Sequence, residues 1–372
     1  MRRPLTVVQL LPALSSGGVE RSTLEIAQAL VEAGHRAIVV SAGGRLVPAL
    51  EATGATHVSL DIGAKSPWVL RHVRPLRRLL AETGADIVHA RSRLPAWIGW
   101  WALRGIPAAR RPHFVTTMHG LNSPSRYSAI MARGERVICV SDTVRTYLLR
   151  HYPDTPTDRL RVIPRGIDPV KFPPAPYPYP TARAEVAARW PQLGGNGPLL
   201  LLPGRGTRLK GHIDAITLLA DLRNAGFDAR LWMPGAREAG RETYIAELMR
   251  EAESLGCADA LAMTEPTDAI ARAYAASDLV LQLSRKPEAF GRTVLEALSS
   301  ARPVAGWAHG GVGELLAQLQ PGGAVAPFDR DALAAAARRL LARAPTRAGT
   351  MPDTLRAMQE ATLAVYDEFD DN

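Results

Sequence analysis

Two loops in the second half of the chain carry residues suited to binding phosphate. The first follows the apolar run Leu199–Leu202 and contains two glycines, Arg205 and Lys210 before a helical pattern begins at about His212. Arginine offers phosphate a bidentate fork and lysine a compact positive charge, so Arg205 and Lys210 are suited to hold a diphosphate. An exposed basic turn would carry the same residue types, and the loop alone does not separate the two interpretations.

The second loop carries two carboxylates eight positions apart, Glu288 and Glu296, with Phe290 and Gly291 between them. A helix that begins near Gly291 would leave the amides of Phe290 and Gly291 as open donors, which favour an anion. Two carboxylates at this spacing are common on solvated helices. The position of Glu288 is more informative, because it lies between the apolar run Leu279–Leu283 and a bare helix N-terminus, where a ligand is expected.

A third loop, from Ser15 to Ser22, contains Gly17 and Gly18. Glycines let a backbone approach a ligand closely, and the helix N-terminus that follows favours anions. The loop is neither the spaced dinucleotide fingerprint nor a Walker A loop. It therefore predicts either a phosphate site or a tight structural turn.

Apolar runs alternate with amphipathic segments along the chain, beginning with Thr6–Leu11 and Ser22–Ala33. Strand-length runs separated by helical patterns of about 10–15 residues are typical of βαβ units and parallel sheets. In such sheets, ligands bind at the carboxyl ends of the strands. The pattern predicts an α/β protein whose ligand loops are the three described above.

A proline-rich stretch, residues 164–180, divides the chain into two regions of this kind. Proline disfavours helices and central strands, so we expect an extended connector there rather than a recognition motif. The predicted organisation is a first domain of residues 1–172, a linker of residues 173–196 and a second domain of residues 197–352. A helix over about 353–372 is expected to pack back on the first domain.

The formal charge of +9 is unevenly distributed. Residues 1–172 hold 24 Lys and Arg against 12 Asp and Glu, whereas residues 173–372 hold 21 against 24. A basic half suits nucleic acid, an anionic membrane or an acidic substrate, although an arginine-rich composition explains part of the excess. Arginine beside Trp and Leu in His72–Leu80 and Trp97–Trp101 favours attachment to an anionic leaflet, while core packing is the other interpretation of the tryptophans.

Several classes of protein are disfavoured. No apolar run is long enough to span a bilayer, and the first residues lack a signal-peptide cleavage site, so a cytoplasmic protein is expected. Cys139 and Cys257 cannot supply a disulfide framework or a zinc site and are expected to be buried. Asp329 and Asp331 superficially resemble a metal-binding pair, but helix capping explains them better. Nucleic-acid binding lacks its aromatic platforms, zinc spacing and recognition helix.

Taken together, these motifs resemble those of the retaining family-4 glycosyltransferases of the GT-B fold, and the resemblance covers nearly the whole chain. Its most specific motif is the E-x7-E segment from Glu288 to Glu296, with Phe-Gly after the first Glu. The segment Ile163–Asp168 is similar to the family's I-P-N-G-I-D motif, with Arg165 where Asn is usual. The remaining motifs are Gly17-Gly18, Arg205 with Lys210-Gly211, Met118-His119-Gly120 and Val140-Ser141-Asp142.

The resemblance implies two Rossmann-like, doubly wound parallel-sheet domains that face a central cleft, with the acceptor on the first and the nucleotide sugar on the second. It assigns Arg205, Lys210, Glu288 and His119 to catalysis. In this assignment Arg205 and Lys210 grip the diphosphate, Glu288 binds donor-sugar hydroxyls, and His119 lies near the transferred sugar. Donor binding falls to Gly17, Gly18, Phe290, Gly291 and Glu296, the last of which would hold the ribose.

The resemblance also implies retention of anomeric configuration and no metal or other cofactor. The expected partners are a nucleotide sugar, with uridine diphosphate as the first candidate, and a glycan or glycolipid acceptor in lipopolysaccharide or polysaccharide assembly. No nucleic acid is expected. Three alternatives remain: a different sugar-nucleotide reaction such as epimerisation or phosphorolysis, a non-catalytic sugar-binding relative, and a basic nucleic-acid-binding protein.

Overall fold

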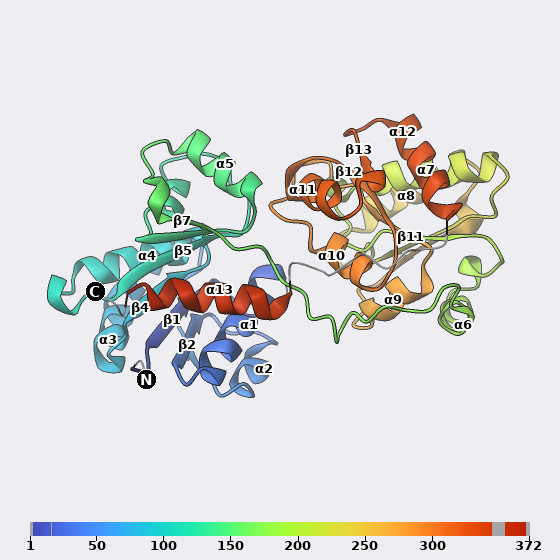
Figure 1. Ribbon diagram of the computed structural model, residues 1–372. Coiled ribbons are helices and arrows are strands. Elements are labelled where there is room, and N and C mark those ends of the chain that lie inside the picture. The colour runs from blue at the N-terminus through green and yellow to red at the C-terminus, as the bar shows by residue number, and fades with distance from the viewer. Residues whose placement is uncertain (1–2, 16, 344–353, 370–372) are drawn as a thin grey trace. The chain divides into compact units, whose positions relative to one another are not determined.

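The computed structural model describes residues 3–15, 17–343 and 354–369, which form two α/β units (Figure 1). One unit takes the described residues up to Gly166 together with those from Leu355 onward. The other runs from Ile167 to Thr354. The prediction of two parallel-sheet α/β domains is confirmed.

The first unit is built on a seven-stranded parallel sheet in the order β3-β2-β1-β4-β5-β6-β7. Hydrophobic strand residues such as Val7, Val39 and Val115 are fully buried, as expected for a parallel sheet covered on both faces. The strands are β1 (Thr6–Leu10), β2 (Arg36–Ser41), β3 (Thr56–Ser59), β4 (Ile87–Ala90), β5 (His113–Met118), β6 (Arg136–Cys139) and β7 (Leu160–Val162).

Helices cover this sheet, and each of the longer ones buries one apolar stripe. In α1, for example, Ile26 and Leu30 lie in the core on the face that packs against β2. The helices are α1 (Gly18–Glu32), α2 (Val47–Glu51), α3 (Val73–Thr83), α4 (Arg93–Arg104), α5 (Asp142–His151) and α13 (Leu355–Asp367). Short 3-10 turns are η1 (Pro67–His72), η2 (Ala108–Arg110), η3 (Ser128–Ala132) and η4 (Thr157–Arg159).

The second unit is built on a six-stranded parallel sheet in the order β10-β9-β8-β11-β12-β13. The strands are β8 (Leu199–Leu201), β9 (Arg230–Pro234), β10 (Leu261–Thr264), β11 (Leu279–Gln282), β12 (Val304–Trp307) and β13 (Ala324–Val325). In both sheets the strand order reverses beside the first strand of the unit. In doubly wound sheets ligands bind at such a reversal, which here lies between β1 and β4 in one unit and between β8 and β11 in the other.

The helices of the second unit also close over a continuous hydrophobic core, to which β8, α7 and α12 all contribute buried side chains. They are α6 (Pro180–Arg189), α7 (His212–Asn224), α8 (Glu242–Ser254), α9 (Ile270–Ala276), α10 (Arg292–Ser299), α11 (Gly310–Leu319) and α12 (Arg330–Leu341), with turns η5 (Pro191–Leu193), η6 (Arg208–Lys210), η7 (Ala258–Ala260) and η8 (Pro321–Gly323). Asp329 caps α12 by accepting from the amide of Ala332 at 2.9 Å, as predicted.

The predicted linker differs from the structure. Residues 167–196 belong to the second unit, and Pro180 begins α6, because proline is tolerated in the first turn of a helix. Arg302, only 1% exposed, holds the proline-rich segment by donating to the carbonyl of Pro176 at 2.6 Å and that of Ala175 at 3.2 Å. The segment is therefore hydrogen-bonded to the second unit.

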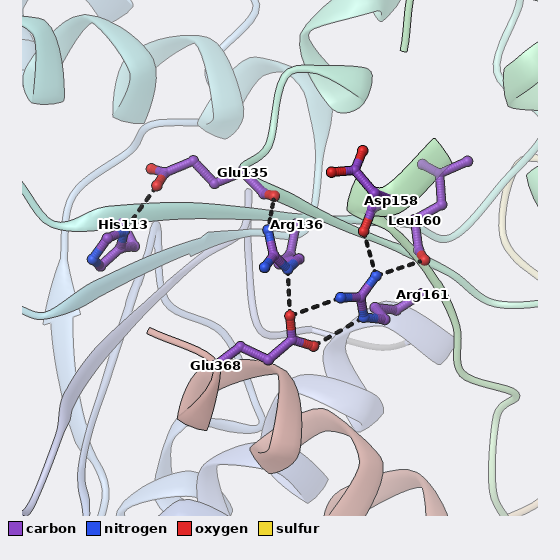
Figure 2. A network of polar contacts seen from close by, with 7 residues as sticks. All are labelled: His113, Glu135, Arg136, Asp158, Leu160, Arg161 and Glu368. Atoms are coloured by element: carbon purple, nitrogen blue, oxygen red, sulfur yellow. Dashed lines mark hydrogen bonds and ion pairs between the residues drawn. The ribbon is translucent and has the colours of Figure 1, made fainter. Parts of the chain in front are cut away.

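Helix α13 joins the first unit although it lies at the far end of the sequence, and it packs on α1 (Figure 1, red beside blue). At the carboxyl end of the helix, Glu368 accepts from Arg136 of β6 at 2.5 Å and from Arg161 of β7 at 2.7 and 2.9 Å (Figure 2). The hydroxyl of Tyr366 lies 2.6 Å from Nδ1 of His89 on β4.

Two further expectations concern membranes and cysteines. Among the described helices, none has the length and apolar character needed to cross a membrane. Cys139 and Cys257 are unpaired and buried, as predicted.

Candidate active site

Lys210 and Glu288 meet at the reversal point of the second sheet. The loop after β8 ends in η6, which carries Lys210, and the loop after β11 carries Glu288. The Nζ of Lys210 lies 2.6 Å from Oε1 of Glu288. The same carboxylate accepts hydrogen bonds from the hydroxyl of Ser284 and, at 3.2 Å, from the amide of Gln282. The structure thus brings together two residues that are 78 positions apart in the sequence.

The loop backbone makes this meeting possible. Gly211 follows Lys210 with φ 74°, a left-handed conformation that favours glycine, and a Cβ there would lie 2.0 Å from the carbonyl oxygen of Leu283. Leu283 follows β11, so the absence of a side chain at Gly211 lets the two loops pack against each other. No larger residue fits this position without displacing one of the loops.

The electrostatics of Glu288 are set by two opposing effects. Burial raises the pKa of the Glu288 carboxyl, but the charge and hydrogen bond of Lys210, together with Ser284 and His309, outweigh it and hold that pKa below its usual range. Glu288 is therefore ionised at neutral pH. An anionic acceptor of hydrogen bonds and a cation lie in contact at the strand ends.

The amides of Phe290 and Gly291 follow Glu288 and have no hydrogen-bond acceptor in the described part of the chain. Gly291 caps α10 with φ 113°, and among the described residues neither its amide nor that of Phe290 donates a hydrogen bond. Phe290 itself is buried. The predicted donor end at Phe290 and Gly291 is therefore present beside the carboxylate.

Arg205 and Glu296, the other charged residues predicted in this unit, form no hydrogen bond or ion pair with Lys210 or Glu288 among the described contacts. Arg205 is exposed, and its side chain forms no hydrogen bond or ion pair within the described part of the chain. Glu296 is buried in α10, accepts from the hydroxyl of Tyr274 at 2.9 Å and lies 3.3 Å from Nε of Arg292. The hydrogen bonds described for Glu288 come from neither Arg205 nor Glu296.

Sequence reasoning missed three polar residues around Glu288. Gln282 ends β11, and Ser284 lies two residues after it. His309 precedes α11, and its Nε2 donates to the carbonyl of Ser284 at 2.7 Å. Polar residues at the end of an otherwise apolar strand were the available signal for Gln282 and Ser284. The His-Gly-Gly sequence after β12 was the signal for His309.

A second cluster occupies the reversal point of the first sheet. Helix α1 starts at Gly18, four residues earlier than predicted, with Gly17 as its cap at φ 141°. Ser22 consequently lies inside the helix and is fully buried. Its hydroxyl accepts from Nη2 of Arg91 at 2.6 Å and from Nη1 of Arg165. Two guanidinium groups thus converge on Ser22, in the first turns of α1.

His119 follows β5 and belongs to this cluster, because Nη2 of Arg165 contacts its Nδ1. Burial, with the positive charges of Arg165 and Arg91 and nearby His89, holds the pKa of His119 well below its usual range. Burial also lowers the pKa of Arg91, to about 10, which leaves it positively charged at neutral pH. The cluster therefore presents cations and a neutral imidazole.

Arg91, Ser22 and Arg165 were not predicted as site residues, and Arg165 is the departure from the I-P-N-G-I-D pattern. In the described ranges, no group of three or more His, Cys, Asp and Glu side chains is arranged to hold a metal ion. Both clusters are rich in hydrogen-bond donors and suit a negatively charged ligand.

Comparison with known families identifies both halves of the chain. Residues 16–171 match the family described as Glycosyltransferase Family 4, and residues 189–351 match Glycosyl transferases group 1. A D-inositol 3-phosphate glycosyltransferase from Xylanimonas cellulosilytica is 28% identical over 248 residues, which cover 62% of this chain and 58% of that protein. The chain spans about half the length of the curated relatives it matches, from 38% to 58%.

Solved structures agree over the whole chain. A glycosyltransferase from Rickettsia africae has a TM-score of 0.83 and 28% identity, covering 99% of both chains. An Anabaena protein crystallised with UDP and glucose has a TM-score of 0.75 and 20% identity, covering 98% of this chain and 100% of that one. At 20% identity the second likeness shows the fold alone.

Proposed function

The chain belongs to the family-4 glycosyltransferases of the GT-B fold, and from that premise we propose that it moves a sugar from a nucleotide-diphosphate donor to a lipid-linked or cell-envelope glycan. The observation that carries the proposal is the contact of Lys210 with Glu288, which is followed in the chain by the amides of Phe290 and Gly291, without an acceptor among the described residues. Uridine diphosphate is the proposed nucleotide, supported by its presence in the Anabaena structure.

The proposed chemistry follows from where charge develops. As the glycosidic bond of a nucleotide sugar breaks, negative charge grows on the departing diphosphate, and donors already aimed at that charge lower the barrier. We assign this task to Lys210, Arg205 and the amides of Phe290 and Gly291. Glu288 is ionised and would accept hydrogen bonds from sugar hydroxyls. Glu296 would bind the ribose, and Gly17 and Gly18 would add backbone contacts to the donor.

Retention and metal independence are parts of the same proposal. Retention by double displacement would need a carboxylate nucleophile on the far face of the sugar. We instead propose substitution on the front face, in which the departing phosphate takes the acceptor proton and His119 contacts the transferred sugar. The arginine, lysine and amide donors would perform the charge neutralisation that a metal provides in other transferases.

The acceptor is proposed to bind the first unit, whose share of the sequence carries the basic excess. An acceptor of lipopolysaccharide or polysaccharide assembly is anionic and lies at a membrane, which matches a basic surface. We therefore propose that the protein works in the cytoplasm and attaches peripherally to the inner face of the cytoplasmic membrane.

The experiment that tests the donor is a thermal-shift screen of the full chain against uridine, guanosine and adenosine diphosphate sugars. A true donor at 100 times its dissociation constant should stabilise the protein by about 2.7 kcal/mol. Product analysis with the stabilising donor then reports turnover and anomeric configuration, and a chelator should leave the rate unchanged. Stabilisation without turnover across an acceptor panel would favour a non-catalytic sugar-binding protein, and no stabilisation by any sugar nucleotide would contradict the proposal.

A further inference from the structure

A groove of about 630 Å³ lies in the first unit between α4 and the segment that leads into η3. Trp97 and Trp101 are one turn apart on α4, and their rings lie 5.3 Å apart between centroids at an angle of 34°. They form the groove with Tyr127, whose side chain is 43% exposed, while that of Trp101 is 38% exposed. The remaining lining residues are Leu94, Arg126, Ala129 and Arg133.

The walls of the groove are held in place by several contacts. The indole nitrogen of Trp97 donates to the carbonyl of Tyr127 at 2.9 Å, which ties α4 to the opposite wall. The guanidinium of Arg133 lies 5.7 Å from the ring centroids of both Trp97 and Trp100. The guanidinium of Arg93 lies 5.2 Å from the ring centroid of Tyr127. The aromatic surface therefore exists before a ligand binds, and less ordering is required on binding.

The charged side chains of the groove are basic. No acidic residue is found among the described residues that line it. Arg93, Arg126 and Arg133 form no ion pair with a carboxylate within the described ranges, and Arg93 donates instead to the hydroxyl of Ser128 at 3.1 Å. Apolar surface next to cations without counter-charges suits a ligand that has an apolar part and an anionic group.

The place of the groove connects it with the proposed site. Helix α4 begins just after β4, and the segment from His119 to Tyr127 begins just after β5, so both walls start at the carboxyl edge of the first sheet. This is the edge at which doubly wound sheets bind ligands. His119 and Tyr127 are the two ends of one loop, eight residues apart.

We infer that this groove is a binding subsite for the acceptor, and that the acceptor is an anionic amphiphile whose apolar part lies on Trp97 and Trp101 and whose anionic group meets Arg126 and Arg133. The inference rests on the proposed transferase function, which it extends by naming the acceptor class and its site. It concerns a single bound molecule rather than a membrane surface.

The test uses the full chain and n-decyl phosphate below its critical micelle concentration, with binding measured by calorimetry. We expect saturable one-to-one binding that weakens about tenfold in Arg126→Ala and in Arg133→Ala, because a charge-assisted hydrogen bond is lost. Trp101→Ala should weaken it as well. Arg150→Ala, at an exposed arginine of α5, is the matched control and should bind normally. Decyl maltoside and inorganic phosphate should each bind at least tenfold more weakly.

Uridine diphosphate binding, measured on the same variants, separates this inference from the proposed function. Unchanged nucleotide affinity shows that the groove variants are folded. If the unmodified protein does not bind uridine diphosphate, that result contradicts the transferase proposal even when decyl phosphate binds. Three results would each overturn the acceptor subsite. Decyl maltoside could bind as tightly as decyl phosphate, or neither arginine substitution could change the affinity for decyl phosphate. The protein could also bind phosphatidylglycerol vesicles without binding monomeric decyl phosphate.

Discussion

Lys210 and Glu288 depend on each other at the level of single residues. The lysine holds the carboxylate ionised, and the carboxylate holds the lysine amine 2.6 Å away at the strand ends. Each therefore has a role in shaping the site as well as any contact with a substrate. Kinetic measurements on variants should separate the role in shaping the site from the role in contacting the substrate.

Lys210→Met should lower kcat by about 100- to 1000-fold if Lys210 stabilises the departing diphosphate. It should also raise the pKa of Glu288, since the nearest cation is removed while burial remains. The acid limb of the pH–rate profile should therefore move to higher pH. Steady-state kinetics between pH 4 and 8 would measure both effects.

Lys286→Met is the matched control, because Lys286 is exposed in the same loop two residues before Glu288. Its rate and acid limb should equal those of the unmodified protein. An unshifted acid limb in Lys210→Met would show that Glu288 does not govern that limb. A normal kcat would remove Lys210 from the chemical step.

The protonation state of His119 depends on Arg165, as that of Glu288 depends on Lys210. Nη2 of Arg165 contacts Nδ1 of His119. A guanidinium can only donate, so this contact favours a neutral imidazole whose nitrogen accepts. The chain carries arginine where the resemblance has asparagine, so the charge of Arg165 adds to that of Arg91 in keeping the imidazole neutral.

Arg165→Met should raise the pKa of His119 toward the unperturbed value of about 6.5, because a neighbouring positive charge is removed. Long-range nitrogen–proton NMR spectra recorded from pH 4 to 8 would follow the ring, with His119→Gln used for assignment. Arg150→Met on α5 should leave the titration unchanged. A His119 titration identical to that of the unmodified protein would show that Arg165 does not set its charge.

At the level of elements, α13 completes the first unit from the far end of the sequence. Its contacts with β6 and β7 converge on one carboxylate, Glu368, shown between its two arginines in Figure 2. Burial raises the pKa of Glu368, but hydrogen bonds from Arg161 and Arg136 outweigh it and hold that pKa below its usual range. The folded state therefore favours the ionised carboxylate.

Glu368→Gln should lower the free energy of unfolding by about 1 kcal/mol at pH 7. Because the folded-state pKa is depressed, the stabilisation is present above the unfolded value of about 4.3 and is lost as pH falls through the folded value. The difference between variant and unmodified protein should therefore shrink in strong acid. Urea denaturation at several pH values would measure it.

The control for this prediction is Glu360→Gln on the same helix. Glu360 pairs with Arg356 across one turn, and its side chain is 64% exposed, so a change of only a few tenths of a kcal/mol is expected. Equal losses in the two variants would show that the converging arginines add nothing to an ordinary surface pair.

At the level of the whole molecule, charge is divided between the halves of the sequence. Residues 1–172 hold twice as many basic as acidic residues, whereas the remainder is slightly acidic. In the first unit, Trp68 and Leu70 of η1 are 77% and 50% exposed, and the exposed Arg71 and Arg74 lie next to them in the sequence. An exposed indole beside arginines suits a lipid interface.

The protein should therefore bind vesicles that contain phosphatidylglycerol, and salt should weaken this binding because each basic residue near the surface contributes about 1 kcal/mol. Co-sedimentation at rising salt would measure it, with phosphatidylcholine vesicles as the uncharged control. Trp68→Ser should weaken vesicle binding without changing the affinity for decyl phosphate. Binding that does not depend on anionic lipid would contradict an electrostatic attachment.

The repeating βαβ pattern and the loops that follow the strands are already legible in the amino-acid sequence. Apolar runs of strand length and glycines at their ends are local features of the sequence. Gly17, Gly18 and the segment from Glu288 to Gly291 could therefore be identified as candidate ligand loops from the sequence. The caps at Asp329 and Gly291 were also legible, because capping depends on neighbouring residues. The bounds of the linker differ in the structure, because the hydrogen bonds of Arg302 to the carbonyls of Ala175 and Pro176 join residues more than 120 positions apart.

Which of these residues contact one another depends on the folded chain. The contacts of Lys210 with Glu288, of Arg165 with His119 and of Glu368 with Arg136 join segments between 46 and 232 positions apart. Such pairings depend on strand order and on helix packing rather than on local propensity. Spacing along the chain does not indicate such pairings. The partners of Glu288 and Glu296 and the aromatic groove therefore could not be predicted from the sequence.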